Sequence, residues 1–263
     1  MSEPVLTETD GAIRTITLAR PERRNALDVE AMRALREALQ GAALDARVRV
    51  VHLTGAGGSF CSGGDVATME EYRSRGELPR LFHELTGEME QGIREIVAMP
   101  KPVLASIPGV AAGGGLSLAL ACDWRIASEE AVLVPAFSRL GAVPDGGLTY
   151  FLPHFLGIGL AQGLLFRDAR IPADQARELG LVHEVVPGAR LSGRAAERAR
   201  ELAAGPIRAW GRLKRLLPAA FHESLEAQLA HEREAAVEAA RGPELTEGIR
   251  AFMEKRPPRF GPG

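Results

Sequence analysis

The sequence has only two cysteines, Cys61 and Cys122, in 263 residues. This number excludes a framework of several disulfides, and no Cys/His set has the spacing of a zinc site. No stretch reaches the ~18 uninterrupted apolar residues that a membrane-spanning helix needs. Residues 1–10 also lack the apolar segment of a secretion signal. We therefore expect a cytoplasmic protein without a membrane span and without a metal site.

An excess of charge of either sign is also missing. The 32 Lys and Arg residues nearly balance 34 Asp and Glu residues, which leaves a net charge of −2. A chain that binds nucleic acid through its phosphates carries a basic excess, so we expect no nucleic-acid partner. The length is sufficient for one full core, alone or with a helical appendage.

Glycine, in contrast, is plentiful, and the most informative run is Gly113-Gly-Gly115. It follows an apolar strand predicted at Val103–Ile107 and opens an apolar helix. The first amides of a helix have no acceptor within the helix, and they lie at the positive end of its dipole. Because glycine has no Cβ, these amides could hold negative charge that develops on a ligand oxygen, as in an oxyanion hole. Close packing of helix on strand is the alternative explanation.

A second glycine-rich loop follows the strand predicted at Val48–Leu53. Five of the eleven residues from Gly55 to Asp65 are glycine, which exceeds what one turn with positive φ requires. The loop lacks the Gly-Lys-Ser/Thr ending of a phosphate-binding loop. The two loops could each supply one amide to a single oxygen.

The order of predicted elements favours an α/β core. Alternating patterns predict a hairpin from Val5–Thr9 and Ala12–Leu18, and Asp28 caps a helix that runs to about Leu44. Strands and helices then alternate, which is typical of parallel strands covered by helices. Further strands are expected at 103–107, 124–127, 131–134 and 182–186, and a long helix at 78–99.

The chain becomes mostly helical from Gly146 onward. Breaks are predicted at Gly205-Pro206, Pro218 and Gly242-Pro243. We expect an α/β core over residues 1–195 and a helical region over residues 196–263 that serves contacts between subunits.

Several motifs in the same order resemble the crotonase superfamily, the enoyl-CoA hydratase/isomerase family. They are Arg20-Pro-x-x-x-Asn-Ala-Leu27, Phe60–Asp65, Lys101–Gly109, Gly113–Asp123, Ala169–Val186 and Phe252-x-x-Lys-Arg256. The resemblance implies a spiral of ββα units with a helical C-terminal region, and assembly into trimers or dimers of trimers. It implies acyl-CoA thioesters as substrates, with coenzyme A as part of the substrate and no separate cofactor.

The resemblance also implies roles for individual residues. The thioester oxygen would lie between the amides of Gly64 and Gly114. Residues that would contact CoA or the acyl group are Arg24, Ala26, Ser62, Asp65, Val66, Ala67, Phe137 and, from the C-terminal helix, Phe252 and Lys255.

Two positions depart from the hydratases of the family. Where those enzymes carry glutamates, this sequence has Ser117 and Phe137. Adding water to an enoyl thioester needs groups that activate water and exchange a proton, and neither residue can do this near neutral pH. Ordinary hydratase activity is therefore not expected.

One carboxylate, Asp145, lies where isomerases and dehalogenases of the family keep theirs. Capping of the next helix is the alternative role. The surrounding segment, residues 135–153, is most similar to isomerases that open a ring epoxide in phenylacetyl-CoA breakdown. We expect an acyl-CoA isomerase with Asp145 as base; a hydratase-like enzyme, a 4-halobenzoyl-CoA dehalogenase and a non-catalytic acyl-CoA-binding protein are the alternatives.

Overall fold

The computed structural model describes residues 3–261, and a six-stranded sheet forms its centre. The predicted hairpin is confirmed: β1 (Val5–Asp10) pairs antiparallel with β2 (Ile13–Leu18). The remaining strands continue in parallel in the order β3, β4, β6 and β9. Their bounds are Val50–Gly55, Val103–Ile107, Trp124–Ser128 and Glu184–Val186.

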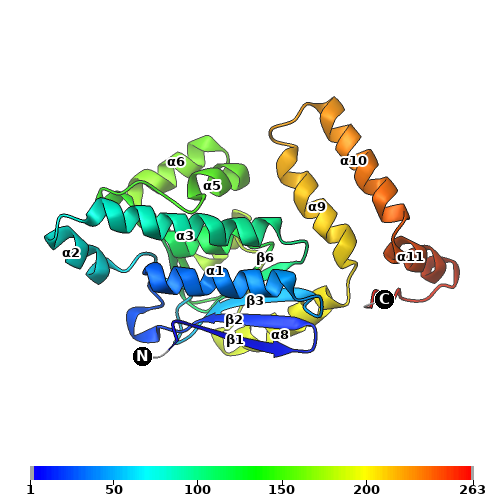
Figure 1. The fold of residues 1–263 in the computed structure, drawn as a ribbon, viewed down its shortest axis with the longest axis horizontal. Helices are drawn as coiled ribbons and strands as arrows, with labels where there is room; N and C mark the ends of the chain where they lie inside the picture. Colours follow the sequence, from blue (N-terminus) through cyan, green and yellow to red (C-terminus); the bar gives the residue numbers. More distant parts are fainter. Residues whose placement is uncertain (1–2, 262–263) are drawn as a thin grey trace.

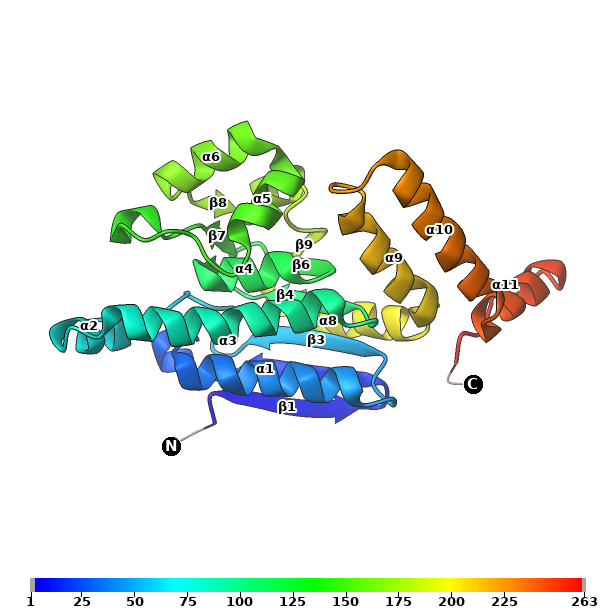
Figure 2. The same ribbon diagram turned by 45° about the horizontal axis from the view of Figure 1, so that its top comes forward.

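Both faces of this sheet are covered by helices. On one face, α1 (Val29–Leu44) and α3 (Leu78–Ala98) lie side by side (Figure 1). On the other face lies α8 (Gly188–Ala203), as Figure 2 shows. Successive strand residues point to opposite faces, so Val51 packs in the core with α1 and α3 while Val50 packs with α8. The strand β4 is therefore buried at every position, whereas the edge strand β1 is exposed at all positions after Val5.

The helix α1 begins as predicted, because the Asp28 carboxylate accepts a hydrogen bond from the Ala31 amide. The domain boundary predicted at residue 195 falls inside α8. The buried residues Leu191, Ala195 and Ala199 of this helix all pack on the sheet. The packing of α8 on the sheet continues past residue 195, with Ala199 buried and Leu202 and Ala203 partly buried.

A second, three-stranded sheet carries the glycine triplet. It consists of β5 (Val110–Ala112), β7 (Val132–Val134) and β8 (Ile171–Pro172). The helix α4 (Gly114–Ala121) thus follows β5, and not β4 directly as the sequence suggested. Three residues are too few for a visible alternation, which is why β5 was not predicted.

Three helices, α9 (Ile207–Ala219), α10 (Leu225–Ala240) and α11 (Pro243–Met253), extend from one end of the core (Figure 1). They are attached by Lys214, whose ammonium lies 2.6 Å from the Asp123 carboxylate, and by Arg49, whose guanidinium donates to the carbonyls of Ala203, Gly205 and Phe260. The break predicted at Pro218 is confirmed to within one residue, since α9 ends at Ala219.

The remaining helices are α2 (Val66–Ser74), α5 (Leu148–Leu156), α6 (Ile158–Arg167) and α7 (Ala173–Glu178), with short 3-10 turns at Pro21–Arg23 and Ser138–Leu140. Within residues 3–261, the apolar helices are all too short, and the long ones too polar, to cross a membrane.

Candidate functional site

The two glycine loops lie side by side. The Cys61 amide donates to the Val110 carbonyl at 3.0 Å, and the Ala112 amide donates to the Cys61 carbonyl at 2.9 Å. These bonds align the chain before Gly64 with the chain before Gly114. Strand pairing thus brings together two loops that are about fifty residues apart in sequence, as the sequence predicted.

Each loop contributes to the lining of the same cavity a glycine whose amide has no acceptor among the hydrogen bonds of residues 3–261. The amides on either side of Gly64 both donate hydrogen bonds within the chain. The Gly63 amide donates to the Cys61 Sγ, and the Asp65 amide donates to the Leu27 carbonyl. The amide of Gly64 itself has no acceptor among the hydrogen bonds of residues 3–261. Gly114 is the first residue of α4, so its amide has no acceptor within the helix. Both glycines line a cavity of about 530 Å³.

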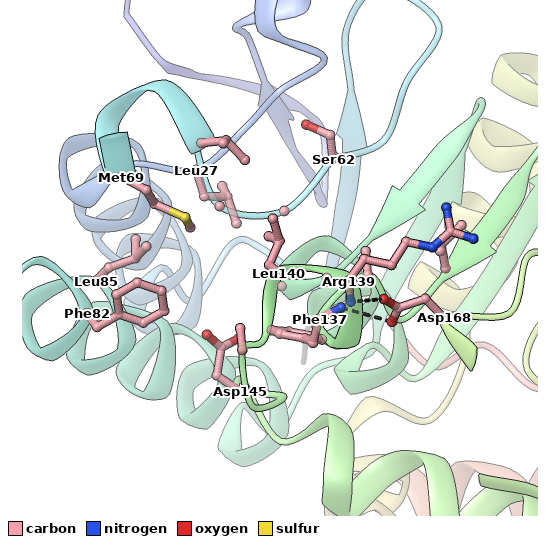
Figure 3. Close-up of a pocket in the computed structure, with 18 of the residues that line it drawn as sticks. Leu27, Ser62, Met69, Phe82, Leu85, Phe137, Arg139, Leu140, Asp145 and Asp168 are labelled. Carbon is pink, nitrogen blue, oxygen red and sulfur yellow. Dashed lines mark hydrogen bonds between the residues drawn. The ribbon is translucent and has the colours of Figure 1, made fainter. Parts of the chain in front are cut away.

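The walls of this cavity are mostly apolar. Figure 3 shows Leu27, Met69, Phe82, Leu85, Phe137 and Leu140 around it. The sequence missed Met89, which also lines it. The signal that could have identified Met89 is its spacing of four residues from Leu85, which in turn follows Leu81 by four. This spacing places all three side chains on the face of α3 that packs against the core.

Asp145 is the carboxylate in the apolar part of the cavity. Figure 3 shows it between the rings of Phe82 and Phe137. A Cβ built on Gly114 would lie 3.8 Å from the Asp145 Oδ1, which places the carboxylate beside the amino end of α4. The same Cβ would lie 2.7 Å from the Met89 methyl, so only glycine fits there without a shift.

The carboxylate of Asp145 does not cap α5. The N-cap of α5 is Gly147, and no side chain forms a capping hydrogen bond there. Burial raises the pKa of Asp145 to about 6, against an opposing hydrogen bond from its own backbone amide. A carboxylate with this pKa is a suitable proton acceptor near neutral pH.

The two other carboxylates of the lining are held by hydrogen bonds. Arg73 donates two to Glu70, and this lowers the pKa of Glu70. Asp168 accepts the amides of Phe137 at 3.0 Å and Arg139 at 2.7 Å, drawn dashed in Figure 3. Burial raises the pKa of Asp168, but these backbone bonds outweigh it, and the pKa is lowered. Asp145 is thus the lining carboxylate whose pKa is raised.

Asp168 is a further residue that sequence reasoning missed. It follows α6 in the left-handed conformation and holds the turn that carries Phe137. Its position directly before the Ala169–Val186 motif is the one signal that could have drawn attention to it.

Ser117 and Phe137, the positions of the missing glutamates, lie in different surroundings. Ser117 is fully buried in α4, and its hydroxyl donates to the Asp145 carbonyl at 2.8 Å. Phe137 lines the cavity with its ring. Neither position supplies a group that can exchange protons near neutral pH.

Most residues that the resemblance assigns to CoA lie together. The Ser62 amide donates to the Arg24 carbonyl at 3.0 Å, so the loop with Arg24 and Ala26 borders the first glycine loop. Ser62 and Val66 line the cavity, and Arg24 is exposed.

Asp65 and Ala67 lie next to the cavity without being part of its lining. The Asp65 carboxylate is buried, forms ion pairs with Arg20 and Arg23, and accepts the Ala67 amide at the start of α2. These bonds fix the turn after Gly64, so the role of Asp65 is structural.

Phe252 and Lys255 are not brought to the cavity of their own chain. Phe252 is 82% exposed at the end of α11. Figures 1 and 2 both show α11 at the opposite end of the molecule from α2, which borders the cavity. A contact between these two residues and a ligand in this cavity requires another subunit.

Known proteins resemble this chain over nearly its whole length. The family model "Enoyl-CoA hydratase/isomerase" matches residues 8–262. The 1,2-epoxyphenylacetyl-CoA isomerase of Escherichia coli (strain K12) is 36% identical over 260 residues, 99% of either chain. A probable enoyl-CoA hydratase of Rhodobacter capsulatus is 38% identical over 253 residues, 96% of either chain.

A solved structure is similar as well. The enoyl-CoA hydratase from Polaromonas sp. JS666 superimposes with a TM-score of 0.92 at 36% identity, covering 97% of this chain and 98% of that one. The chain has the crotonase fold and belongs to the enoyl-CoA hydratase/isomerase family.

Proposed function

We propose that this protein is an acyl-CoA isomerase that shifts a double bond with Asp145 as its only base. The observation that carries the proposal is the carboxylate of Asp145, which lies beside Gly114 in an apolar cavity and has a pKa of about 6. Family membership supports an acyl-CoA thioester as the substrate.

In the proposed mechanism, the amides of Gly64 and Gly114 donate to the thioester oxygen. As Asp145 removes a proton from the α-carbon, the electron pair delocalises into the thioester and forms an enolate, which the two amides stabilise. The protonated Asp145 returns the proton at the γ-carbon, and the double bond moves by one position. No atoms are gained or lost.

Opening of a ring epoxide to an oxepin is a second reaction that the same groups could perform. The identity of 36% to the Escherichia coli isomerase favours this substrate, and the rings of Phe82 and Phe137 suit an aromatic acyl group. A role in phenylacetate breakdown would follow from such a substrate.

Three alternatives stay open to test. A hydratase, favoured by the Rhodobacter capsulatus relative, would need a second proton-exchanging group. The other two carboxylates of the lining, Glu70 and Asp168, are held by hydrogen bonds that lower their pKa. A dehalogenase would use Asp145 as a nucleophile on an aromatic ring and release halide from 4-halobenzoyl-CoA. A non-catalytic binding protein would bind CoA esters without turnover.

The experiment that tests the proposal is NMR in D₂O with a 3-enoyl-CoA, using the wild type and Asp145→Asn. The expected result is migration of the double bond in the wild type and its loss in the variant. Deuterium enters at the α- and γ-carbons where the proton held by Asp145 exchanges with D₂O before it is returned. Addition of water would support a hydratase, and binding without any exchange on 3-enoyl or ring-epoxide esters would support a binding protein.

We also propose a trimer or a dimer of trimers. Large apolar side chains are exposed along the C-terminal helices, among them Leu217, Leu225, Leu229, Ile249 and Met253. Light scattering on the purified protein tests this assembly, which would also allow Phe252 and Lys255 to reach CoA bound to a neighbouring subunit. The cytoplasmic location stays a prediction from the sequence.

A further inference from the structure

The hydroxyl of Ser117 joins two segments of the site that are far apart in sequence. A serine in a helix commonly donates to the carbonyl four residues before it. That bond is long here, 3.5 Å to the Gly113 carbonyl, whereas the bond to the Asp145 carbonyl is 2.8 Å. Ser117 is fully buried, so this hydrogen bond is shielded from competing water.

The backbone next to Asp145 fits closely around this serine. Gly146 has a φ of +57°, a conformation that side chains other than glycine rarely adopt. A Cβ on Gly146 would lie 2.8 Å from the Ser117 Cβ and 3.2 Å from the Met89 Cγ. The turn that carries Asp145 is therefore in direct contact with α4 and could not carry a side chain at this point.

The helix that receives this contact also carries one of the two cavity amides. Gly114 lies one helical turn before Ser117, so its amide and the Ser117 hydroxyl belong to the same rigid segment. A movement of α4 would shift the oxyanion donor, and through the hydroxyl it would shift the base.

We propose that Ser117 is a positioning residue that ties the turn of Asp145 to α4, so that the base and the Gly114 amide keep a fixed relative position. This inference rests on the proposed function, because it takes Asp145 as the base. Ser117 exchanges no proton with the substrate. It takes the place of a glutamate of the hydratases and supports the single carboxylate that this chain uses instead.

The test compares Ser117→Ala with Ser128→Ala. Ser128 is also fully buried, and its hydroxyl donates to the Pro108 carbonyl at 2.9 Å, outside the lining of the cavity. Each variant loses one buried hydroxyl-to-carbonyl hydrogen bond, so the two should lose comparable thermal stability. We expect only Ser117→Ala to lower kcat, by about tenfold, with KM changed by less than about twofold.

The pH profile separates positioning from a merely structural role. Without the hydroxyl, the turn can move toward water, and a better hydrated carboxylate has a lower pKa. The limb of the profile that reports the base should therefore shift to lower pH in Ser117→Ala and stay in place in Ser128→Ala. The charged side chains that share the cavity, Glu70, Arg73, Arg139, Asp168 and Arg170, are the same in all variants.

A measurement without substrate keeps the inference separate from the proposed function. Aspartate labelled with carbon-13 at the side-chain carboxyl gives a titration signal for Asp145, assigned by its loss in Asp145→Asn. The signal should titrate at lower pH in Ser117→Ala. An unchanged midpoint together with wild-type kcat would overturn the role of Ser117. A shifted midpoint in a protein that isomerises none of the substrates would instead overturn the proposed function.

Discussion

The Asp168 carboxylate accepts the backbone amide of Phe137 at 3.0 Å, and this bond joins the end of α6 to the ring that lines the cavity. A second bond, from the Arg139 amide at 2.7 Å, fixes the same turn. One side of the cavity is therefore set by a hydrogen-bonded turn, while α4 and the turn of Asp145 form another side.

Asp168→Asn should weaken substrate binding more than turnover. Asparagine tolerates the left-handed backbone at this position (φ +44°), but its amide has one acceptor oxygen where the carboxylate has two. The turn with Phe137 then loosens, and we expect KM for acyl-CoA esters to rise about tenfold with kcat changed little. Steady-state kinetics measure this. A larger effect on kcat than on KM would show that the turn serves the chemical step.

Asp145→Asn should abolish most turnover and leave binding of CoA esters intact. A positioned general base contributes about 10²–10⁴-fold to the rate. Asparagine keeps the size of the side chain, so the cavity should remain. Isothermal titration with a non-reacting CoA thioester checks binding, and the NMR assay checks turnover. Turnover within about threefold of the wild type would reject Asp145 as the base.

Activity should fall as the pH drops below about 6, because the base must be ionised and burial raises the pKa of Asp145 to about 6. The kcat/KM of the wild type, measured from pH 5 to 8, should follow one ionisation on its acidic side. A profile that stays flat down to pH 5 would mean that the active base has the usual pKa of a carboxyl, about 4.

The raised pKa of Asp145 also predicts that the fold becomes more stable at low pH, where activity falls. Because the pKa of Asp145 is higher in the folded chain than in the unfolded chain, its ionised form destabilises the fold above about pH 6, and this cost is relieved as the pH falls toward about 4. Asp145→Asn should therefore raise the melting temperature at pH 7.5. The free energy of unfolding should increase by at most about 2–3 kcal/mol. At pH 4 the difference from the wild type should vanish.

The sequence predicted those parts of the fold that local patterns specify. The hairpin follows from the alternation of apolar and polar residues, and the start of α1 from the capping residue Asp28. The helix α3 follows from its apolar stripe. Each of these patterns involves only residues that are close in sequence. The two neighbouring glycine loops were also predicted, since each follows an apolar strand.

Contacts between distant segments were not predictable in this way. Neither the bond between Phe137 and Asp168 nor that between Ser117 and Asp145 leaves a periodic pattern in the sequence. The two possible roles of Asp145 could not be separated either, because the choice depends on where α5 begins. The structure excludes the capping role, since Gly147 occupies the N-cap of α5 and the Asp145 side chain lines the cavity. The role of Asp145 as base stays a prediction.

Ser117→Glu should not convert this protein into a hydratase, although it restores the residue type of those enzymes. Ser117 is fully buried against Gly146, and a longer side chain there must displace the turn of Asp145. A buried carboxylate without a partner also carries a desolvation cost. We expect loss of isomerisation and no addition of water to 2-enoyl-CoA, measured by absorbance of the conjugated thioester. Ser117→Gln, equal in size but uncharged, should lose isomerisation to the same extent, because displacement of the turn is the common cause. Hydration by the glutamate variant but not by the glutamine variant would contradict this expectation. It would show that the turn can accommodate a second base, and that the hydrogen bond from Ser117 to Asp145 is not the reason why this site does not hydrate enoyl-CoA.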